Sequence, residues 1–381
     1  MIIKEKPEDF YVKEIINLNK KRPGETFKYF ILQKRNLTTI RAIKIISRKL
    51  KISKKRISFA GEKDKKAITE QYIAIRGLKE YKEFYDFGNV KLKYIGSFAE
   101  PISISDIIGN EFKIIVRKVN EEEKKKFLEN IEILKEGFVN YFDDQRFGDV
   151  RCNNHLIGKE IIKRNWEEAC KILLTFISEK ESKIALEARK WLKENWGNWR
   201  EAVKKFPKWL DIELAVLNYL IKYPNDFLGA LKNIHRRLLR LFIHSYQSYL
   251  WNKAVSEYIK EITQNYKILK LEIGELHVPM EKEKICKLKD EKFPIIGYDT
   301  NLKSMKESYR KIIEKILKEE NIKTEDFFFL EESYLSAEGS LRNIIAEPEN
   351  LEYEIKEDNI YLKFILDKGS YATMFIKHLF L

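Results

Sequence analysis

Hydrophobic and polar residues alternate with the period of a β-strand in the first part of the chain. Phe10 and Val12 alternate with Tyr11 and Lys13, and the same alternation runs through residues 27–32. Shorter strand-like stretches follow at residues 57–60, 71–75, 90–95 and 112–119. The pattern predicts a sheet in this part of the protein.

Between residues 38 and 50 the period changes to that of an amphipathic helix. The apolar positions of this helix are Ile40, Ile43, Ile46 and Leu50. The basic positions fall on the other side, at Arg41, Lys44, Arg48 and Lys51. We therefore expect one face of the helix to pack and the other to carry positive charge.

The middle of the chain has a different texture. From about residue 155 to about residue 260 the apolar spacing is helical, with breaks at Gly197, Pro207, Pro224 and Gly229. All six tryptophans lie between Trp166 and Trp251. This clustering predicts a separate, mainly helical body with its own aromatic core.

Strand and helix patterns both return toward the C-terminus. A helix at residues 121–135 precedes the helical region. After it come strand-like residues 268–278, a helix at 303–319, a hairpin at 351–355 and 360–366, and a short helix from about residue 370. The simplest architecture is a mixed α/β domain built from both ends of the chain and interrupted by a mainly helical insertion.

Composition fits a folded protein with at least two cores. The 381 residues are 44% hydrophobic and 35% charged. The net charge is +14, and residues 1–76 hold 21 Lys or Arg against 8 Asp or Glu. Charge networks of heat-adapted proteins could explain the total. Concentration of the excess in one segment instead favours a nucleic-acid-binding face.

The cysteine and histidine patterns give no support for a disulfide framework or a metal site. The three cysteines are far apart, and the five histidines show neither HxH nor HExxH spacing. No stretch has the length and hydropathy of a signal peptide or a membrane span. We expect a cytoplasmic protein without a metal.

The most informative stretch is Gly61-Glu62-Lys63-Asp64-Lys65-Lys66-Ala67-Ile68-Thr69-Glu70-Gln71, between two predicted strands. An aspartate among lysines is compatible with a turn residue or a solvated ion pair. Alternatively, flanking ammonium groups would hold the carboxylate of Asp64 ionised, as a nucleophile beside a phosphate backbone requires. The pattern by itself leaves both open.

The stretch resembles the signature of the TruD family of pseudouridine synthases, Gly-x-Lys-Asp-Lys/Arg-x-Ala-x-Thr-x-Gln. Every fixed position is present, at Gly61, Lys63, Asp64, Lys65, Ala67, Thr69 and Gln71. The resemblance implies that Asp64 is the catalytic aspartate.

A second stretch, residues 140–148, is similar to the family's Asn-Tyr-Phe-Gly-x-Gln-Arg-Phe-Gly, with Asp143 where glycine is usual. If that glycine supplies a positive φ angle, aspartate can adopt it at modest cost. The resemblance assigns uridine binding to Asn140 and base stacking to Phe142.

Two terminal stretches complete the resemblance. Residues 7–14 are similar to the family's opening Pro-Glu-Asp-Phe-x-Val-x-Glu, which makes Phe10 a substrate contact and matches Lys4 to a lysine near the catalytic carboxylate. Residues 366–373 resemble Leu-Pro-x-Gly-Ser-Tyr/Phe-Ala-Thr, with Asp367 in place of proline, and make Tyr371 a substrate contact.

The resemblance also implies an architecture and an activity. A pseudouridine synthase catalytic domain with a mixed, partly antiparallel sheet would comprise residues 1–152 and 339–381, and residues 153–338 would form a mainly helical TRUD insertion domain. The substrate would be tRNA, modified at position 13 in the D arm without a cofactor, by an enzyme for which a monomer is favoured. We expect RNA phosphates to be bound by Arg41, Lys44, Arg48, Lys51 and Lys63.

Two other classes of function are compatible with parts of the sequence. One is an RNA-binding protein that keeps the fold without the activity, against which the complete signature around Asp64 argues. The other is an RNA hydrolase with Glu62 and Asp64 as paired acids, which would share a face if the stretch were extended. RNA cleavage products would distinguish that hydrolase from an isomerase.

Overall fold

The computed structural model describes residues 1–381, which form two compact units. Unit 1 comprises residues 1–138 and 346–380, and unit 2 comprises residues 139–345 with residue 381. The chain passes from one to the other at β9 (Phe138–Val139) and returns at β14 (Ile345–Ala346). In the structure, the chain changes from one unit to the other after residue 138 and after residue 345. The sequence analysis instead predicts the domain boundaries after residues 152 and 338.

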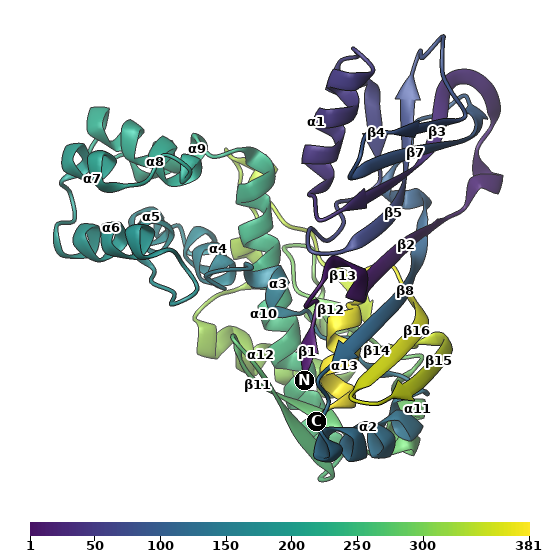
Figure 1. Ribbon diagram of the computed structural model, residues 1–381. Helices are drawn as coiled ribbons and strands as arrows, with labels where there is room; N and C mark the ends of the chain where they lie inside the picture. The colour runs from purple at the N-terminus through teal and green to yellow at the C-terminus, as the bar shows by residue number, and fades with distance from the viewer. The chain divides into compact units, whose positions relative to one another are not determined.

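Unit 1 is built around a large mixed sheet, which confirms the predicted α/β class. Its strand order is β15-β16-β8-β2-β5-β3-β7-β6, with β1 paired to β8 and β4 paired to β5. The strands are β1 (Ile2–Ile3), β2 (Phe10–Ile16), β3 (Pro23–Arg35), β4 (Ile57–Phe59), β5 (Ile68–Arg76), β6 (Phe84–Asp86), β7 (Val90–Phe98), β8 (Ile107–Arg117), β15 (Glu349–Lys356) and β16 (Asn359–Asp367). Strands from both chain ends thus share one sheet, as Figure 1 shows in purple and yellow.

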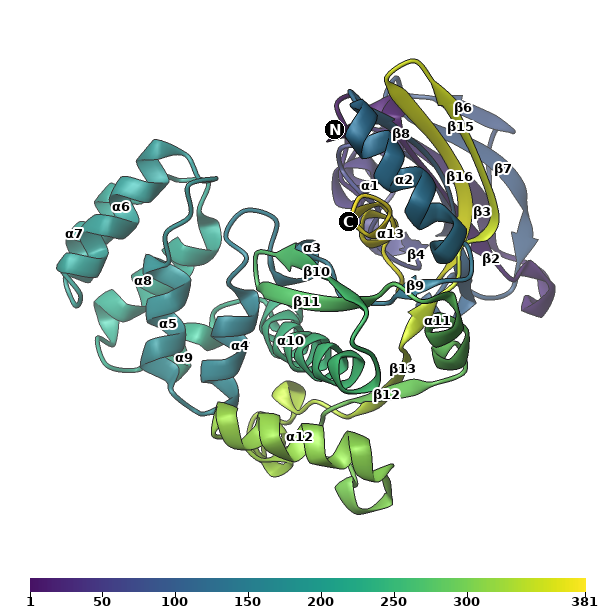
Figure 2. The ribbon, with the colours of Figure 1, turned by 90° about the horizontal axis from the view of Figure 1, so that it is seen from below.

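One face of this sheet is covered by helices α1 (Thr39–Lys49), α2 (Glu121–Leu134) and α13 (Ala372–Leu379), as Figure 2 shows. Cross-strand neighbours point to the same face of a sheet. The covered face is mostly apolar and buried, but a cluster of buried polar residues interrupts it, namely Glu14, Lys34, Thr69 and Gln71. The fold thus places four polar side chains where apolar ones would normally pack.

Helix α1 packs as predicted except in its first turn. Ala42, Ile43 and Ile46 are buried against β3, β5 and β7, and the hydroxyl oxygen of Thr38 caps the helix by accepting a hydrogen bond from the N–H of Arg41. The prediction that Ile40 belongs to the packed face is wrong, because Ile40 is 41% exposed. Ala42 takes part in the packing instead, which rotates the buried stripe away from Ile40.

Unit 2 is mainly helical, as predicted for the middle of the chain. Its helices are α3 (Asp144–Phe147), α4 (Asn154–Ile162), α5 (Trp166–Thr175), α6 (Lys183–Glu194), α7 (Trp199–Lys205), α8 (Asp211–Lys222), α9 (Phe227–Lys232), α10 (Arg236–Ile262), α11 (Lys282–Leu288) and α12 (Glu307–Glu320). Its strands are β10 (Tyr266–Leu271), β11 (Gly274–Pro279), β12 (Lys292–Ile295) and β13 (Ser340–Asn343). The long helix α10 is the centre of the unit and contacts α4, α12, β11 and β12.

The tryptophans of unit 2 do not all enter its core. Trp251 and Trp199 are buried, but Trp209 is 62% exposed, so the prediction of one aromatic core is wrong for that residue. Trp209 lies in the turn between α7 and α8 rather than on a helix face that packs. No helix of the protein combines the length and hydropathy needed to cross a bilayer.

Candidate active site

Asp64 lies in a loop, residues 61–67, that connects β4 to β5. Side chains from neighbouring elements hold the backbone of this loop. Gln71 of β5 donates a hydrogen bond to the carbonyl of Gly61 at 3.0 Å, and the N–H of Lys63 donates to the hydroxyl of Thr39, the first residue of α1, at 3.1 Å. The Thr39 hydroxyl in turn donates to the Gln71 side chain at 2.9 Å. Signature positions Gly61, Lys63 and Gln71 therefore fix the shape of the loop.

The carboxylate of Asp64 is paired with the ammonium of Lys4. Lys4 Nζ donates to Asp64 Oδ1 at 2.8 Å and lies 3.9 Å from the centroid of the Phe10 ring. Lys4 has a φ angle of 61°, a left-handed conformation that is uncommon outside glycine. The structure thus brings together three residues that the sequence singles out from separate motifs.

Phe10 is placed by the acidic residue that precedes it. The Asp9 carboxylate is buried and accepts two hydrogen bonds from the Arg117 guanidinium, at 2.7 and 3.0 Å, and one from the N–H of Lys6 at 2.8 Å. Burial opposes ionisation, but the hydrogen bonds from Arg117 and Lys6 outweigh it and lower the pKa of Asp9. Phe10 itself is only 2% exposed, and the Lys4 ammonium lies over its ring.

Lys34 of β3 donates hydrogen bonds to the backbone of the loop that carries Asp64. Its Nζ donates to the carbonyl of Asp64 at 2.6 Å and to the carbonyl of Lys63 at 3.2 Å. The side chain is fully buried, and burial lowers the pKa of Lys34 to about 8 although the charge of Asp64 raises it. Sequence reasoning did not single out this lysine.

Lys63 differs from its expected role as a phosphate contact. Its Nζ donates to Glu14 Oε1 at 2.6 Å, and the second oxygen of Glu14 accepts from the N–H of Tyr72 at 2.9 Å. Glu14 has no exposed side-chain surface, and the Lys63 side chain is only 10% exposed. An ammonium paired to a buried carboxylate has little left to offer a phosphate, so this geometry indicates that Lys63 anchors the loop.

Tyr371 lies at the N-cap position of α13 and is half-buried. Its carbonyl accepts hydrogen bonds from the N–H groups of Met374 and Phe375, which starts the helix. Phe375 packs edge-on against Phe364 of β16, so α13 covers the part of the sheet around β16. Tyr371 therefore lies where the chain passes from β16 into the helix α13.

Asn140, in unit 2, is held by an arginine that is distant in sequence. Arg342 donates from Nη2 to Asn140 Oδ1 at 2.7 Å, and from Nε and Nη2 to the Asn140 carbonyl at 3.0 and 2.8 Å. The amide nitrogen of Asn140 donates to the carbonyl of Asn343 at 3.3 Å. The amide orientation of Asn140 is therefore set by its neighbours.

Phe142 lies between this arginine and an aromatic ring. The Arg342 guanidinium carbon is 4.0 Å from the Phe142 ring centroid, and Trp251 contacts the ring edge-on at 5.6 Å. Phe142 is 7% exposed. Asp143, the departure from the usual glycine, has a φ angle of −80° and caps α3, so no positive φ is required there.

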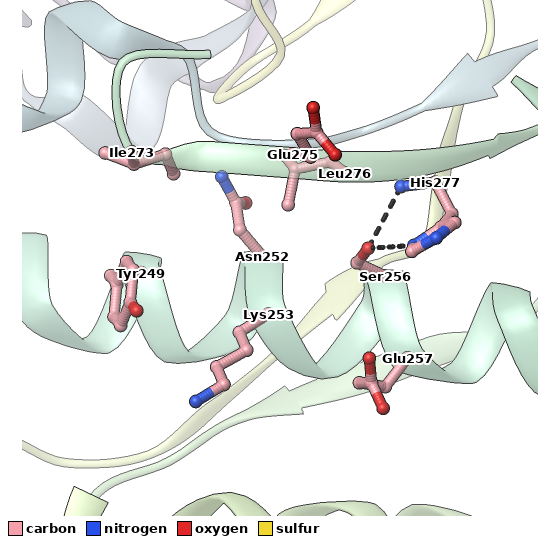
Figure 3. Close-up of a pocket in the computed structure, with 9 residues that line it drawn as sticks. All are labelled: Tyr249, Asn252, Lys253, Ser256, Glu257, Ile273, Glu275, Leu276 and His277. Atoms are coloured by element: carbon pink, nitrogen blue, oxygen red, sulfur yellow. Dashed lines mark hydrogen bonds between the residues drawn. The ribbon is translucent and has the colours of Figure 1, made fainter. Parts of the chain in front are cut away.

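A pocket of about 250 Å³ lies elsewhere in unit 2, along α10 and β11 (Figure 3). The Ser256 hydroxyl accepts from the N–H of His277 and bonds to its Nδ1, both at 2.9 Å. Asn252, another lining residue, binds the backbone of Phe142 with both ends of its amide. Because these polar groups are already bonded within the protein, the pocket presents no set of free groups for chemistry.

The basic positions of α1 differ from most surface lysines of the protein. Arg41, Lys44 and Arg48 on α1 and Lys51, which follows the end of the helix with a left-handed φ angle of 53°, are all exposed, and none of them forms an ion pair. On α2, by contrast, Lys124, Lys125 and Lys126 each pair with a glutamate of the same helix. Ion-pair networks therefore account for the lysines of α2 but not for the basic residues of α1, whose charge is not neutralised by a neighbouring carboxylate.

Acidic clusters are not a feature of this region. The Asp64 carboxylate is bonded to a lysine rather than to a second acid, which weighs against the paired-acid hydrolase. No group of three or more His, Cys, Asp or Glu side chains is arranged to hold a metal ion.

Comparisons with known proteins agree along the full length of the chain. The profile of the family tRNA pseudouridine synthase D (TruD) matches residues 1–379. A Methanococcus maripaludis protein named probable tRNA pseudouridine synthase D 1 is 38% identical, with 100% of this chain and 99% of that protein covered. The Aquifex aeolicus tRNA pseudouridine synthase D is 33% identical, with 99% and 97% covered. A solved Methanosarcina mazei structure that carries the TruD name superposes with a TM-score of 0.73 at 28% identity, covering 99% of this chain and 93% of that one.

The mixed sheet, the lysine-bound carboxylate in its signature loop and these relatives together define a pseudouridine synthase, which is an isomerase. Within that class, the chain belongs to the tRNA pseudouridine synthase D (TruD) family.

Proposed function

We propose that this enzyme converts uridine to pseudouridine at position 13 in the D arm of tRNA, with Asp64 as its catalytic carboxylate and no cofactor. One observation carries the proposal: Asp64 is the carboxylate of the family signature, and its side chain is held by the ammonium of Lys4 beside an aromatic ring. The hydrogen bond from Lys4 fixes the position of this carboxylate.

The reaction breaks the bond between the sugar C1′ and uracil N1 and forms a bond between C1′ and uracil C5. The proton on C5 is released and N1 gains a proton, so the overall change is an isomerisation without oxidation. As N1 leaves, C1′ becomes electron-poor, and the Asp64 carboxylate either bonds to it or removes a neighbouring sugar proton. Both routes use the same ionised carboxylate.

The proposal assigns the aromatic contacts of the uracil to Phe10, Tyr371 and Phe142, because an aromatic face holds a ring without fixing its in-plane orientation. Asn140 is the hydrogen-bonding contact. In both units a cation already lies over one of these rings, Lys4 over Phe10 and Arg342 over Phe142.

The exposed, unpaired basic residues of α1, together with Lys51 just after the helix, are proposed to bind RNA phosphates. They are Arg41, Lys44, Arg48 and Lys51. A uridine inside folded tRNA must first leave its stack, at a cost of a few kcal/mol, and phosphate contacts on either side help to offset that cost.

Release of tritium from tRNA labelled at uracil C5 tests the reaction. We expect the native enzyme to release label and Asp64→Asn to release none while it still binds tRNA. Asp86→Asn is the matched control, since Asp86 is also paired with a lysine, Lys91 at 3.3 Å, but lies on the exposed strand β6. Label release by Asp64→Asn would overturn the assignment.

Three further measurements test the rest of the proposal. A transcript with cytidine at position 13 is expected to lose the modification, and modification elsewhere at an equal rate would contradict the assigned position. Activity is expected to survive exhaustive dialysis against a chelator. Cleaved RNA on a denaturing gel would instead support a hydrolase.

A further inference from the structure

Lys34 is the most unusual charged residue of unit 1. It is a fully buried lysine near the end of β3, where its partner on β5 is Thr69 and its neighbours on the same face include the apolar Leu32 and Val90. Burying an ammonium costs several kcal/mol unless hydrogen bonds compensate it. An aliphatic residue would fill this position without that cost, so the charge calls for a specific reason.

The hydrogen bonds of Lys34 go to the backbone of the catalytic loop rather than to a carboxylate. The ammonium donates to the backbone carbonyls of Asp64 and of Lys63, the residue before it. Residues 61–67 have no regular secondary structure to orient these carbonyls. Lys34 therefore supplies the interaction that a helix or sheet partner would normally supply.

We propose that Lys34 is a positioning residue for the isomerisation: its buried ammonium fixes the backbone carbonyl of Asp64 and thereby aims the Asp64 carboxylate. The inference rests on the proposed role of Asp64. A displacement of about 1 Å at a catalytic group lowers a rate by on the order of 100-fold. Loss of the ammonium is therefore expected to affect turnover rather than RNA binding.

The surroundings of Lys34 make its charge sensitive to alkaline pH. Two charged residues of the loop, Asp64 and Lys63, lie near the Lys34 ammonium. Each of them is bonded to a further charged group, Lys63 to Glu14 of β2 and Asp64 to Lys4. Burial lowers the pKa of Lys34 to about 8, well below that of an exposed lysine. The protonated form that holds the carbonyls is thus lost as the pH rises through about 8.

The chain offers a matched control for this lysine. Lys28 lies on the same strand and the same face of the sheet, is also buried, and is bonded to Glu25 and Ser97 rather than to the catalytic loop. Both lysines can be replaced by methionine, which keeps the length of the side chain and removes the charge. A difference between the two variants reports on the loop and not on buried lysines in general.

The test measures single-turnover rates on C5-tritiated tRNA at saturating enzyme, from pH 6.5 to 9.5, with the dissociation constant for tRNA measured by filter binding. Lys34→Met is expected to lower the rate at pH 7 about 100-fold with the dissociation constant within about twofold of native. Lys28→Met is expected to keep the native rate. The native and Lys28→Met rates should fall above pH 8, and this fall should be absent in Lys34→Met.

Several results would overturn the proposal. A Lys34→Met rate within about twofold of native, or equal losses in the two variants, would remove the positioning role. A native rate that stays level to pH 9.5 would also contradict the positioning role, and this test holds even if Lys34→Met fails to fold. Asp64→Asn in the same assay separates the two ideas, because an active Asp64→Asn contradicts the catalytic assignment, whereas an inactive one with an active Lys34→Met contradicts only this inference.

Discussion

The side-chain amide of Asn252 binds the backbone of Phe142 on both sides: its oxygen accepts from the Phe142 N–H at 2.9 Å and its nitrogen donates to the Phe142 carbonyl at 2.8 Å. Both residues are buried. Replacement by leucine, Asn252→Leu, leaves a donor and an acceptor unpaired, at a cost of about 1–3 kcal/mol for each. We expect a loss of about 2–6 kcal/mol in the free energy of unfolding of unit 2.

Urea denaturation followed by tryptophan fluorescence measures this loss, because all six tryptophans lie in unit 2. The control is Asn218→Leu, since the amide of Asn218 bonds only to Leu214 on an exposed helix turn. We expect the control to stay within about 0.5 kcal/mol of native. Equal effects of both substitutions would contradict a special role for Asn252.

Arg342 is expected not to tolerate a lysine. Its guanidinium bonds two oxygens of Asn140 and covers the Phe142 ring at the same time, which the single ammonium of a lysine cannot reproduce. We expect Arg342→Lys to lower kcat/KM by about 10–100-fold, corresponding to the loss of hydrogen bonds to a charged group. Arg236→Lys is the control, because Arg236 also covers a ring, that of Tyr334 at 4.7 Å, without contacting the motif around Asn140. A native kcat/KM in Arg342→Lys would argue against the uridine contacts proposed for this motif.

The basic face of α1 is expected to set the salt dependence of tRNA binding. Each phosphate contact contributes about 0.7–0.9 to the slope of log K against log salt concentration. Changing Arg41, Lys44, Arg48 and Lys51 to glutamine should reduce the slope by about 3, whereas kcat at saturating tRNA stays unchanged. Changing Lys124, Lys125 and Lys126 on α2 should leave the slope as it is, because those lysines are paired with glutamates. An unchanged slope in the α1 variant would remove this face from the interface.

Two buried threonines beside the catalytic loop are expected to respond in opposite directions to replacement by valine. Thr39 uses its hydroxyl twice, toward Gln71 and the N–H of Lys63, so Thr39→Val should destabilise the protein by about 1–3 kcal/mol. The hydroxyl of Thr69 is buried without a hydrogen-bond partner, so Thr69→Val should raise the free energy of unfolding by about 1 kcal/mol. Chemical denaturation of both variants measures the two changes in the free energy of unfolding. A loss in Thr69→Val would mean that its hydroxyl is hydrogen-bonded in solution.

Local periodicity was enough to find most of the elements of the sheet. Residues 27–32 fall in β3 and residues 360–366 in β16, since side chains on one covered face must alternate. The two-residue strands β9 and β14 are too short to show a period, and the first turn of α1 turned Ile40 outward. Which strands pair, and in what order, depends on contacts that a single sequence does not display.

For the candidate site, too, the sequence indicates the residues that lie in local motifs but not those whose partners are distant in the chain. Short motifs single out Asp64, Asn140 and Phe142 as candidates, because their neighbours in sequence are part of the signal. Lys34 and Arg342 were missed, because their partners lie 30 and 202 residues away in the chain. Nothing in the sequence near Lys34 distinguishes a buried lysine from the many exposed ones.

The position of β16 in the sheet has a consequence for how the protein is made. Strand β16 pairs with β8, next to β2, yet its residues follow those of unit 2 in the chain. A ribosome therefore finishes residues 139–345 before it releases the strand and the helix α13 that complete the sheet carrying Asp64. The growing chain holds every residue of the helical core of unit 2 while the sheet of unit 1 still lacks β15 and β16, so the sheet beside the Asp64 loop is completed only after unit 2 has been synthesised.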